Sequence, residues 1–249
     1  MKLTAYKTHA IGPSESILKI LDRYVPSLPN NSILAITSKI ISLCQNRVVK
    51  KSDTVNKPAL IREEADWFLE GDYSERYGIC LTIKDNILIP TAGIDESNGN
   101  DHLILYPTEV QKVANEIWEH LAQREQNKKI GVLITDSRTT PLRRGVTGIA
   151  LAFCGFAPLN SYIDQPDIHG RPLRVTTVNV PDALAASAVF MMGEGNEQTP
   201  LVLIENPDKV KFLEREPSSE EIASMHISKE DDLYAPLLTS VVWQQGGKA

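Results

Sequence analysis

The spacing of hydrophobic and polar positions predicts a chain that contains both strands and helices. Short β-branched apolar runs occur at 32–36, 130–134 and 200–204. Each has the length of a buried strand and borders a polar segment. The segment 77–90 predicts a β-hairpin, because two apolar runs flank the turn at 84–86.

Apolar residues recur at helical spacing in several other segments. We predict helices over 13–25, 58–70, 107–125 and 181–192, and a further strand over 173–179. Pro13 and Ser14 are the start signals of the first helix. Residues 206–235 are highly charged, and we predict that the C-terminal segment 206–249 is partly mobile.

A carboxylate and several hydroxyls follow the apolar run at 130–134. Asp136 and Ser137 stand where a rigid strand would present chemistry to a cleft. Arg143 and Arg144 come next, and guanidinium groups near a carboxylate suggest anions held beside a metal. A capped turn with solvated arginines is an equally good interpretation of this stretch.

Two more acidic positions lie at the ends of predicted elements. Asp95 belongs to the oxygen-rich loop 91–100, and Glu194 belongs to the glycine-rich loop 193–197. Plain turns explain each loop taken alone. Together with Asp136 they form a set of hard oxygen ligands of the kind that Mg²⁺ or Mn²⁺ uses when it bridges nucleotide phosphates.

The segment Thr37-Ser38-Lys39 resembles part of a phosphate site at a strand end. No Gly-x-x-x-x-Gly-Lys precedes it, so it is not a P-loop. On spacing alone, a solvent-exposed Lys39 is the simpler interpretation.

Composition restricts the functional classes. The chain of 249 residues fits one large domain or two small ones. Its net charge of −6 argues against nucleic acid as a partner but leaves phosphate ligands open. The 3 cysteines form no metal or disulfide spacing. No apolar run reaches transmembrane length, so we predict a cytoplasmic protein that binds no membrane.

Several motifs in order resemble the coenzyme F420-0:L-glutamate ligase family. They are SILAITSKIISLCQNRVV, GIDESN, TDSRTTPLRRGVTGIAL, DIHGRPLRVTTVNVPDALAASA and MGEGNEQTPLVLI. The resemblance extends from about Ser32 to Glu205. A similar variant group carries the label of a folate-metabolism γ-glutamate ligase.

The resemblance implies a fold, an activity and an assembly. The fold would be α+β, with mixed and antiparallel sheets, flanking helices and an intertwined homodimer. It would form one unit over 1–249, either undivided or made of two interleaved subdomains. The activity would be GTP-dependent addition of L-glutamate to a carboxylated acceptor, F420-0-like or folate-like, through an acyl phosphate.

The resemblance also assigns residues by position. Mg²⁺ or Mn²⁺, with a monovalent ion such as K⁺, would accompany the nucleotide, and the metal ligands would be Asp95, Asp136, Ser137 and Glu194. Asp136 and Arg143 would serve catalysis, with Arg143 and Arg144 suited to anions of the acceptor or of glutamate. The GTP-binding residues would be Ser38, Lys39, Asn98, Met192, Gly193, Gly195, Asn196 and Thr199.

Some positions depart from the family pattern. Leu43 replaces a lysine, Thr139 to Arg143 replace Gly-Arg-Pro-Trp-Arg, and Gly148 replaces an acidic residue. These departures leave two alternatives to the ligase. One is a nucleotide hydrolase or phosphotransferase on the same scaffold, and the other is a catalytically silent nucleotide-binding regulatory protein.

Overall fold

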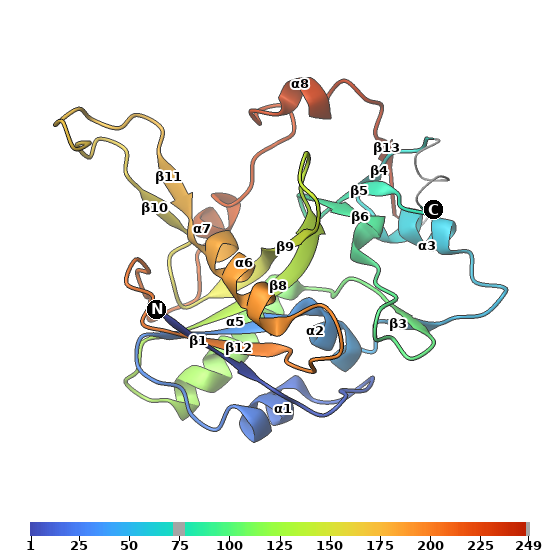
Figure 1. Cartoon of the computed structure of the whole chain (residues 1–249), viewed down its shortest axis with the longest axis horizontal. Coiled ribbons are helices and arrows are strands. Elements are labelled where there is room, and N and C mark those ends of the chain that lie inside the picture. Colours follow the sequence, from blue (N-terminus) through green and yellow to red (C-terminus); the bar gives the residue numbers. More distant parts are fainter. Residues whose placement is uncertain (72–77, 248–249) are drawn as a thin grey trace.

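The computed structural model describes residues 1–71 and 78–247, and its centre is a mixed five-stranded sheet (Figure 1). The strands, in spatial order, are β1 (Lys2–Tyr6), β12 (Leu201–Glu205), β2 (Ser32–Thr37), β8 (Ile130–Thr139) and β9 (Val146–Cys154). Strands β2 and β8 are parallel, and the other pairs are antiparallel. The carboxyl ends of β2 and β8 therefore meet at the same edge.

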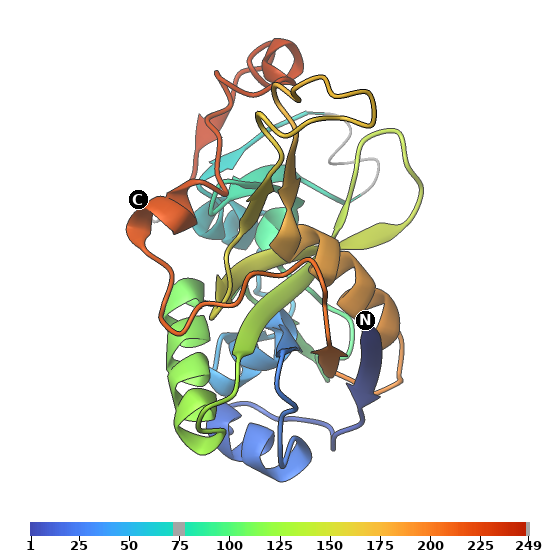
Figure 2. The same ribbon diagram turned by 90° about the vertical axis from the view of Figure 1, so that its left-hand side faces the viewer.

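Helices cover both faces of this sheet, as α5 and α6 show in Figure 2. One face packs against α1 (Ile17–Tyr24), α2 (Ser38–Cys44) and α5 (Val110–Arg124), and the other packs against α6 (Val180–Met192). Successive residues of β2 alternate between these two cores, because strand side chains have a period of two. Burial on both faces explains why β2 reads as an unbroken apolar run.

A second sheet adjoins the first. Its order is β13 (Gln244–Gln245), β4 (Trp67–Phe68), β5 (Leu81–Lys84) and β6 (Ile87–Pro90). Around it lie α3 (Lys57–Glu64), the 3₁₀ helix η1 (Thr91–Gly93), and the pair β3 (Val48–Lys50) and β7 (His102–Ile104). The two sheets meet where Ile87 and Ile89 pack against Ile149 of β9.

The remaining elements lie outside the two sheets. β10 (Leu159–Ser161) and β11 (Thr177–Asn179) form a hairpin that projects from the body (Figure 1). The C-terminal segment carries α7 (Ser219–Ala223) and α8 (Ala235–Leu238) before β13 joins β4. Together these elements confirm the predicted α+β class.

Several sequence predictions are confirmed closely. The helices expected over 107–125 and 181–192 are α5 and α6, with bounds that differ by at most three residues. The hairpin predicted over 77–90 is β5–β6, although Tyr77 lies outside the described residues. Its turn residues Asp85 and Asn86 have φ of 49° and 60°, as a two-residue type I′ turn requires.

Other predictions of element bounds are wrong. The helix predicted over 58–70 ends at Glu64, and β4 follows because Trp67 and Phe68 pair with β5. The helix predicted from Pro13 begins at Ile17, since Ser14 adopts φ of 64°. The strand predicted over 173–179 is confined to Thr177–Asn179.

Strand β8 extends beyond the apolar run at 130–134. It shifts register between Ile134 and Thr135 and then continues to Thr139, paired with β9. Asp136 therefore lies inside a strand and pairs with Ile149, whereas the apolar run predicts that the strand ends before it.

The cysteines Cys44, Cys80 and Cys154 are all free thiols. Within residues 1–71 and 78–247, none of the helices has both the length and the apolar character needed to cross a bilayer.

Candidate functional site

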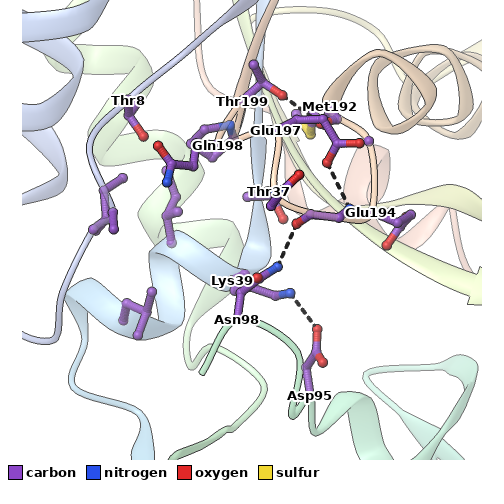
Figure 3. Close-up of a pocket in the computed structure, with 18 of the residues that line it drawn as sticks. Thr8, Thr37, Lys39, Asp95, Asn98, Met192, Glu194, Glu197, Gln198 and Thr199 are labelled. Atoms are coloured by element: carbon purple, nitrogen blue, oxygen red, sulfur yellow. Dashed lines mark hydrogen bonds and ion pairs between the residues drawn. The ribbon is translucent and has the colours of Figure 1, made fainter. Parts of the chain in front are cut away.

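A cavity of about 360 Å³ opens at the carboxyl end of β2, beside the carboxyl-terminal half of β8 (Figure 3). Four segments wall it: the N-terminal strap, which we define as residues 8–11, helix α2, the loop after η1, and the loop that joins α6 to β12. Thr37 at the end of β2 and Asp136 in β8 also line it. The cavity is thus built from parts of the chain that are distant in sequence.

The loop after α6 is held in a defined shape. Asn179 is the N-cap of helix α6, and its side chain accepts a hydrogen bond from the Asp182 backbone N–H. Gly193 is the C-cap, with φ of 75°. The left-handed conformation favours glycine at this exit. Thr199 then donates a 2.6 Å hydrogen bond from its hydroxyl to the Met192 carbonyl, which closes the loop.

Lys39 and the loop after η1 form the polar wall of the cavity. The Lys39 Nζ atom lies 2.7 Å from Asp95 Oδ2 and 2.9 Å from Ser97 Oγ. Burial alone would raise the pKa of Asp95, but the hydrogen bonds from Lys39 and Ser97 outweigh it and lower the pKa. Asn98 donates a 2.9 Å hydrogen bond to the Gly195 carbonyl and so joins this loop to the loop after α6 (Figure 3).

Asp136 is a partly buried carboxyl group in the cavity wall. Burial raises its pKa to about 7, and the nearby charge of Asp95 adds to this effect. Hydrogen bonds from the Ser137 backbone N–H, at 2.8 Å, and from the Ser38 side chain act in the opposite direction. A carboxyl group of this kind gains most from a cation beside it.

Glu194 approaches the same place from the end of α6. Burial raises its pKa, and a hydrogen bond with the Ser137 side chain opposes that shift. Asp95 and Lys39 both contribute to the electrostatic environment of Glu194. The three predicted metal-ligand carboxylates therefore interact across one cavity.

The donor set fits a divalent cation that shares its coordination with a ligand. In the part of the chain that the structure describes, no three His, Cys, Asp or Glu side chains are placed to hold an ion among themselves. Mg²⁺ ordinarily takes one or two protein carboxylates and completes its shell with water and phosphate oxygens. Asp95, Asp136, Glu194 and the Ser137 hydroxyl offer hard oxygen donors of that kind.

The structure brings together most of the residues that the sequence singled out. The cavity-lining residues among them are Lys39, Asp95, Asn98, Asp136, Ser137, Met192, Gly193, Glu194, Gly195, Asn196 and Thr199. Ser38 is buried beneath the cavity, against Asp136. Arg143 lies apart from the cavity, in the exposed turn between β8 and β9.

Sequence reasoning missed the N-terminal strap. The Thr8 backbone N–H donates a 2.9 Å hydrogen bond to the Gln198 carbonyl, which fixes the strap beside the loop after α6. His9 is held by Tyr24 at 2.7 Å and by Glu15 at 2.9 Å. No sequence motif marks the strap, because only tertiary contacts carry it to the cavity.

Two other side chains bear on the departures from the family pattern. Leu43 lines the cavity and is 9% exposed. Gly148 lies against α6, where an added Cβ would come within 2.2 Å of the Ala185 carbonyl oxygen. Close packing therefore accounts for glycine at position 148 in this chain.

The chain is thus an α+β protein with an acid-lined cavity at the carboxyl end of β2. Residues 6–206 match the family described as F420-0:Gamma-glutamyl ligase. The chain belongs to this family.

Individual relatives are consistent with this assignment. The chain is 29% identical over 208 residues to the coenzyme F420:L-glutamate ligase of Methanococcus maripaludis strain C6, which covers 77% of this chain and 81% of the relative. The enzyme of the same name from Methanothermobacter thermautotrophicus is 29% identical over 202 residues, or 76% and 80% of the two chains. The coenzyme F420:L-glutamate ligase of Methanocaldococcus jannaschii is 33% identical over 126 residues, which are 51% of this chain and 50% of the relative.

Proposed function

We propose that this protein is a ligase that joins L-glutamate to a carboxylated acceptor and uses GTP with a divalent metal ion. The family supports glutamate ligation, since its relatives carry the name of glutamate ligases. One observation carries the rest of the proposal: Lys39, Asp95, Asp136 and Glu194 line a single cavity. A lysine ammonium group and carboxylates of the kind that bind metals, together in one pocket, suit a nucleoside triphosphate.

The nucleotide would lie with its phosphates toward Lys39 and the acidic residues. The cavity wall also includes apolar and backbone groups of the strap together with Ile40, which suit a purine ring. Asn98 and the closed loop from Met192 to Thr199 would border the phosphates.

The proposed reaction has two steps. A carboxylate oxygen of the acceptor attacks the γ-phosphorus, the bond to the β-phosphate oxygen breaks, and GDP leaves. The amine of glutamate then attacks the carbonyl carbon of the acyl phosphate, inorganic phosphate departs, and the amine loses a proton. When bound, Mg²⁺ or Mn²⁺ would supply neutralisation of the phosphate charge.

The chain contributes positioning and exclusion of water in both steps. Asp95, Asp136, Glu194 and Ser137 would hold the metal, and Lys39 would bind a phosphate oxygen. Arg143 and Arg144 would bind anionic groups of the acceptor or of glutamate from the turn between β8 and β9. A K⁺ ion at the nucleotide remains part of the proposal through the family resemblance.

The protein would act as a homodimer. Large apolar side chains are exposed on the β8–β9 turn, the β10–β11 hairpin and α6, with exposed fractions of 100% for Leu142, 94% for Ile168 and 85% for Phe190. A monomer gains nothing from exposing such groups on projecting elements. A second copy of the chain would cover them.

One observation favours a different function. Leu43 occupies the cavity wall where a cation would help to bind phosphates, so nucleotide binding without turnover is a coherent second candidate. The hydrolase or phosphotransferase alternative predicts turnover that needs no glutamate.

The experiment that separates these functions is product analysis. Purified protein is incubated with GTP, Mn²⁺, L-glutamate and F420-0, and each component is omitted in turn while GDP is quantified by chromatography and the acceptor by mass spectrometry. The ligase predicts GDP release that requires both glutamate and acceptor, with a glutamylated product. GDP release without glutamate would establish a hydrolase, and the absence of release with tight GTP binding would establish a silent binding protein.

A further inference from the structure

Lys39 occupies one carboxylate oxygen of Asp95, a proposed metal ligand. Its ammonium group contacts Asp95 Oδ2 at 2.7 Å, and it also donates to Ser97 Oγ at 2.9 Å and to the Ser97 carbonyl at 3.3 Å. The other oxygen, Asp95 Oδ1, accepts the Ser97 backbone N–H at 2.7 Å. Both carboxylate oxygens of Asp95 are therefore engaged within the protein.

This arrangement disfavours a divalent ion at the same carboxylate. An ammonium group and a divalent cation bound to one carboxylate would lie a few ångströms apart, and their repulsion is strong where solvent is partly excluded. The lysine side chain is long and flexible, and that of Lys39 is 25% exposed. It can therefore leave Asp95 for a nearby anion. In the cavity, the anion that suits an ammonium group is a phosphate oxygen.

We infer that Lys39 competes with the divalent metal ion for Asp95 in the nucleotide-free protein, and that a bound triphosphate removes this competition by taking the ammonium group. The inference rests on the proposed function. Its consequence is that metal and GTP bind cooperatively through one side chain, since each ligand favours the position of Lys39 that the other requires. Lys39 is thus a coupling residue as well as a phosphate ligand.

The test is a titration of Mn²⁺ into the full chain, with free Mn²⁺ measured by electron paramagnetic resonance. Wild type, Lys39→Met and Lys39→Arg are compared without nucleotide and with saturating GTP. Without nucleotide, Lys39→Met binds Mn²⁺ roughly tenfold more tightly than wild type, in the usual range of coupling between sites. Lys39→Arg keeps the charge and stays close to wild type.

Lys51→Met is the matched control. Lys51 pairs with Glu96 at 2.9 Å, one residue beyond Asp95, and it does not line the cavity. This variant also removes one lysine charge that pairs with the loop after η1, and it leaves Mn²⁺ affinity within about twofold of wild type, because exposed charges contribute little.

The cooperativity itself is the second measurement. GTP strengthens Mn²⁺ binding several-fold in wild type, and the gain is much smaller in Lys39→Met. Equal or weaker Mn²⁺ binding by Lys39→Met without nucleotide overturns the inference while the proposed function stands. Failure of every variant to bind Mn²⁺, with or without GTP, overturns both, and thermal unfolding confirms that each variant is folded.

Discussion

For single residues, the site depends on where one partly buried carboxyl group lies. Asp136 belongs to a strand whose register shifts between Ile134 and Thr135. The sequence indicated Asp136 as a site residue from its position after an apolar run, but the register shift depends on pairing with β9. Strand pairing is a non-local interaction, so a single stretch of sequence does not reveal it.

Asp136→Asn tests the metal-binding role of this carboxyl group. The amide has nearly the same shape but carries no charge, so the fold should persist while Mn²⁺-dependent GTP binding falls by at least tenfold, as expected for loss of a charged ligand. Calorimetry measures the affinity and circular dichroism the fold. Unchanged affinity for both ligands would refute the assignment of the site.

Leu43→Lys tests the cavity wall at a departure from the family pattern. Leu43 lines the cavity beside Lys39 and Ile40, so a lysine there adds a cation near the proposed triphosphate. GTP should bind roughly tenfold more tightly, the equivalent of one charge-assisted hydrogen bond. Equal affinity in wild type and variant would show that position 43 does not face the phosphates.

At the scale of elements, the cavity requires α6 to lie close to β9. The sequence predicted α6 from its small apolar residues, and also α5 and the β5–β6 hairpin, because each has a strong local pattern. It did not predict β4, whose Trp67 and Phe68 pair with β5, since tertiary pairing overrides helical spacing there. The strap at residues 8–11 had no local signal either.

Gly148→Ala tests the approach of α6 to β9. The new Cβ would lie 2.2 Å from the Ala185 carbonyl oxygen, so α6 must shift and the loop that starts at Gly193 shifts with it. We expect a loss of about 1–3 kcal/mol in unfolding free energy, measured by urea denaturation, together with weaker GTP binding. Gly12→Ala is the control, because the nearest atom to its Cβ is a Glu15 carboxylate oxygen at 3.5 Å.

Glu221 gives a prediction about pH at the start of α7. Hydrogen bonds from the Arg215 side chain and the Ser218 backbone lower the pKa of Glu221 to about 2. Because the folded protein holds this carboxylate ionised, its stabilisation is complete above the ordinary glutamate pKa and is lost as pH falls toward 2.

Glu221→Gln should therefore lower stability by about 1 kcal/mol at pH 7, the usual worth of a capping box with an exposed ion pair. The difference from wild type should shrink steadily below pH 4.5. Thermal unfolding across pH and hydrogen exchange of the α7 amides at pH 7 measure both effects. A difference that stays constant down to pH 2.5 would contradict the assigned role of the carboxylate.

At the scale of the whole molecule, the projecting elements bear on assembly. The β8–β9 turn and the β10–β11 hairpin extend from the body (Figure 1), and both expose large apolar side chains. Residues such as Leu142 and Ile168 make no contribution to the core of one chain. Their pattern is what a dimer interface would require.

Light scattering after size-exclusion chromatography tests the dimer. The wild-type protein should have twice the chain mass of 27.6 kDa, and Leu142→Asp, at a side chain that is 100% exposed, should shift the population toward monomer without loss of the fold. A wild-type mass of one chain across the micromolar range would rule out the proposed homodimer.

We propose that the acid-lined cavity binds a nucleoside triphosphate together with a divalent metal ion. Calorimetric titration of GTP, and then of ATP, into the wild-type protein with and without Mn²⁺ tests it most directly. The proposed function predicts GTP binding that requires Mn²⁺ and exceeds ATP binding. Failure of both nucleotides to bind in the presence of Mn²⁺ would contradict the proposed ligase activity and leave only the fold and the family.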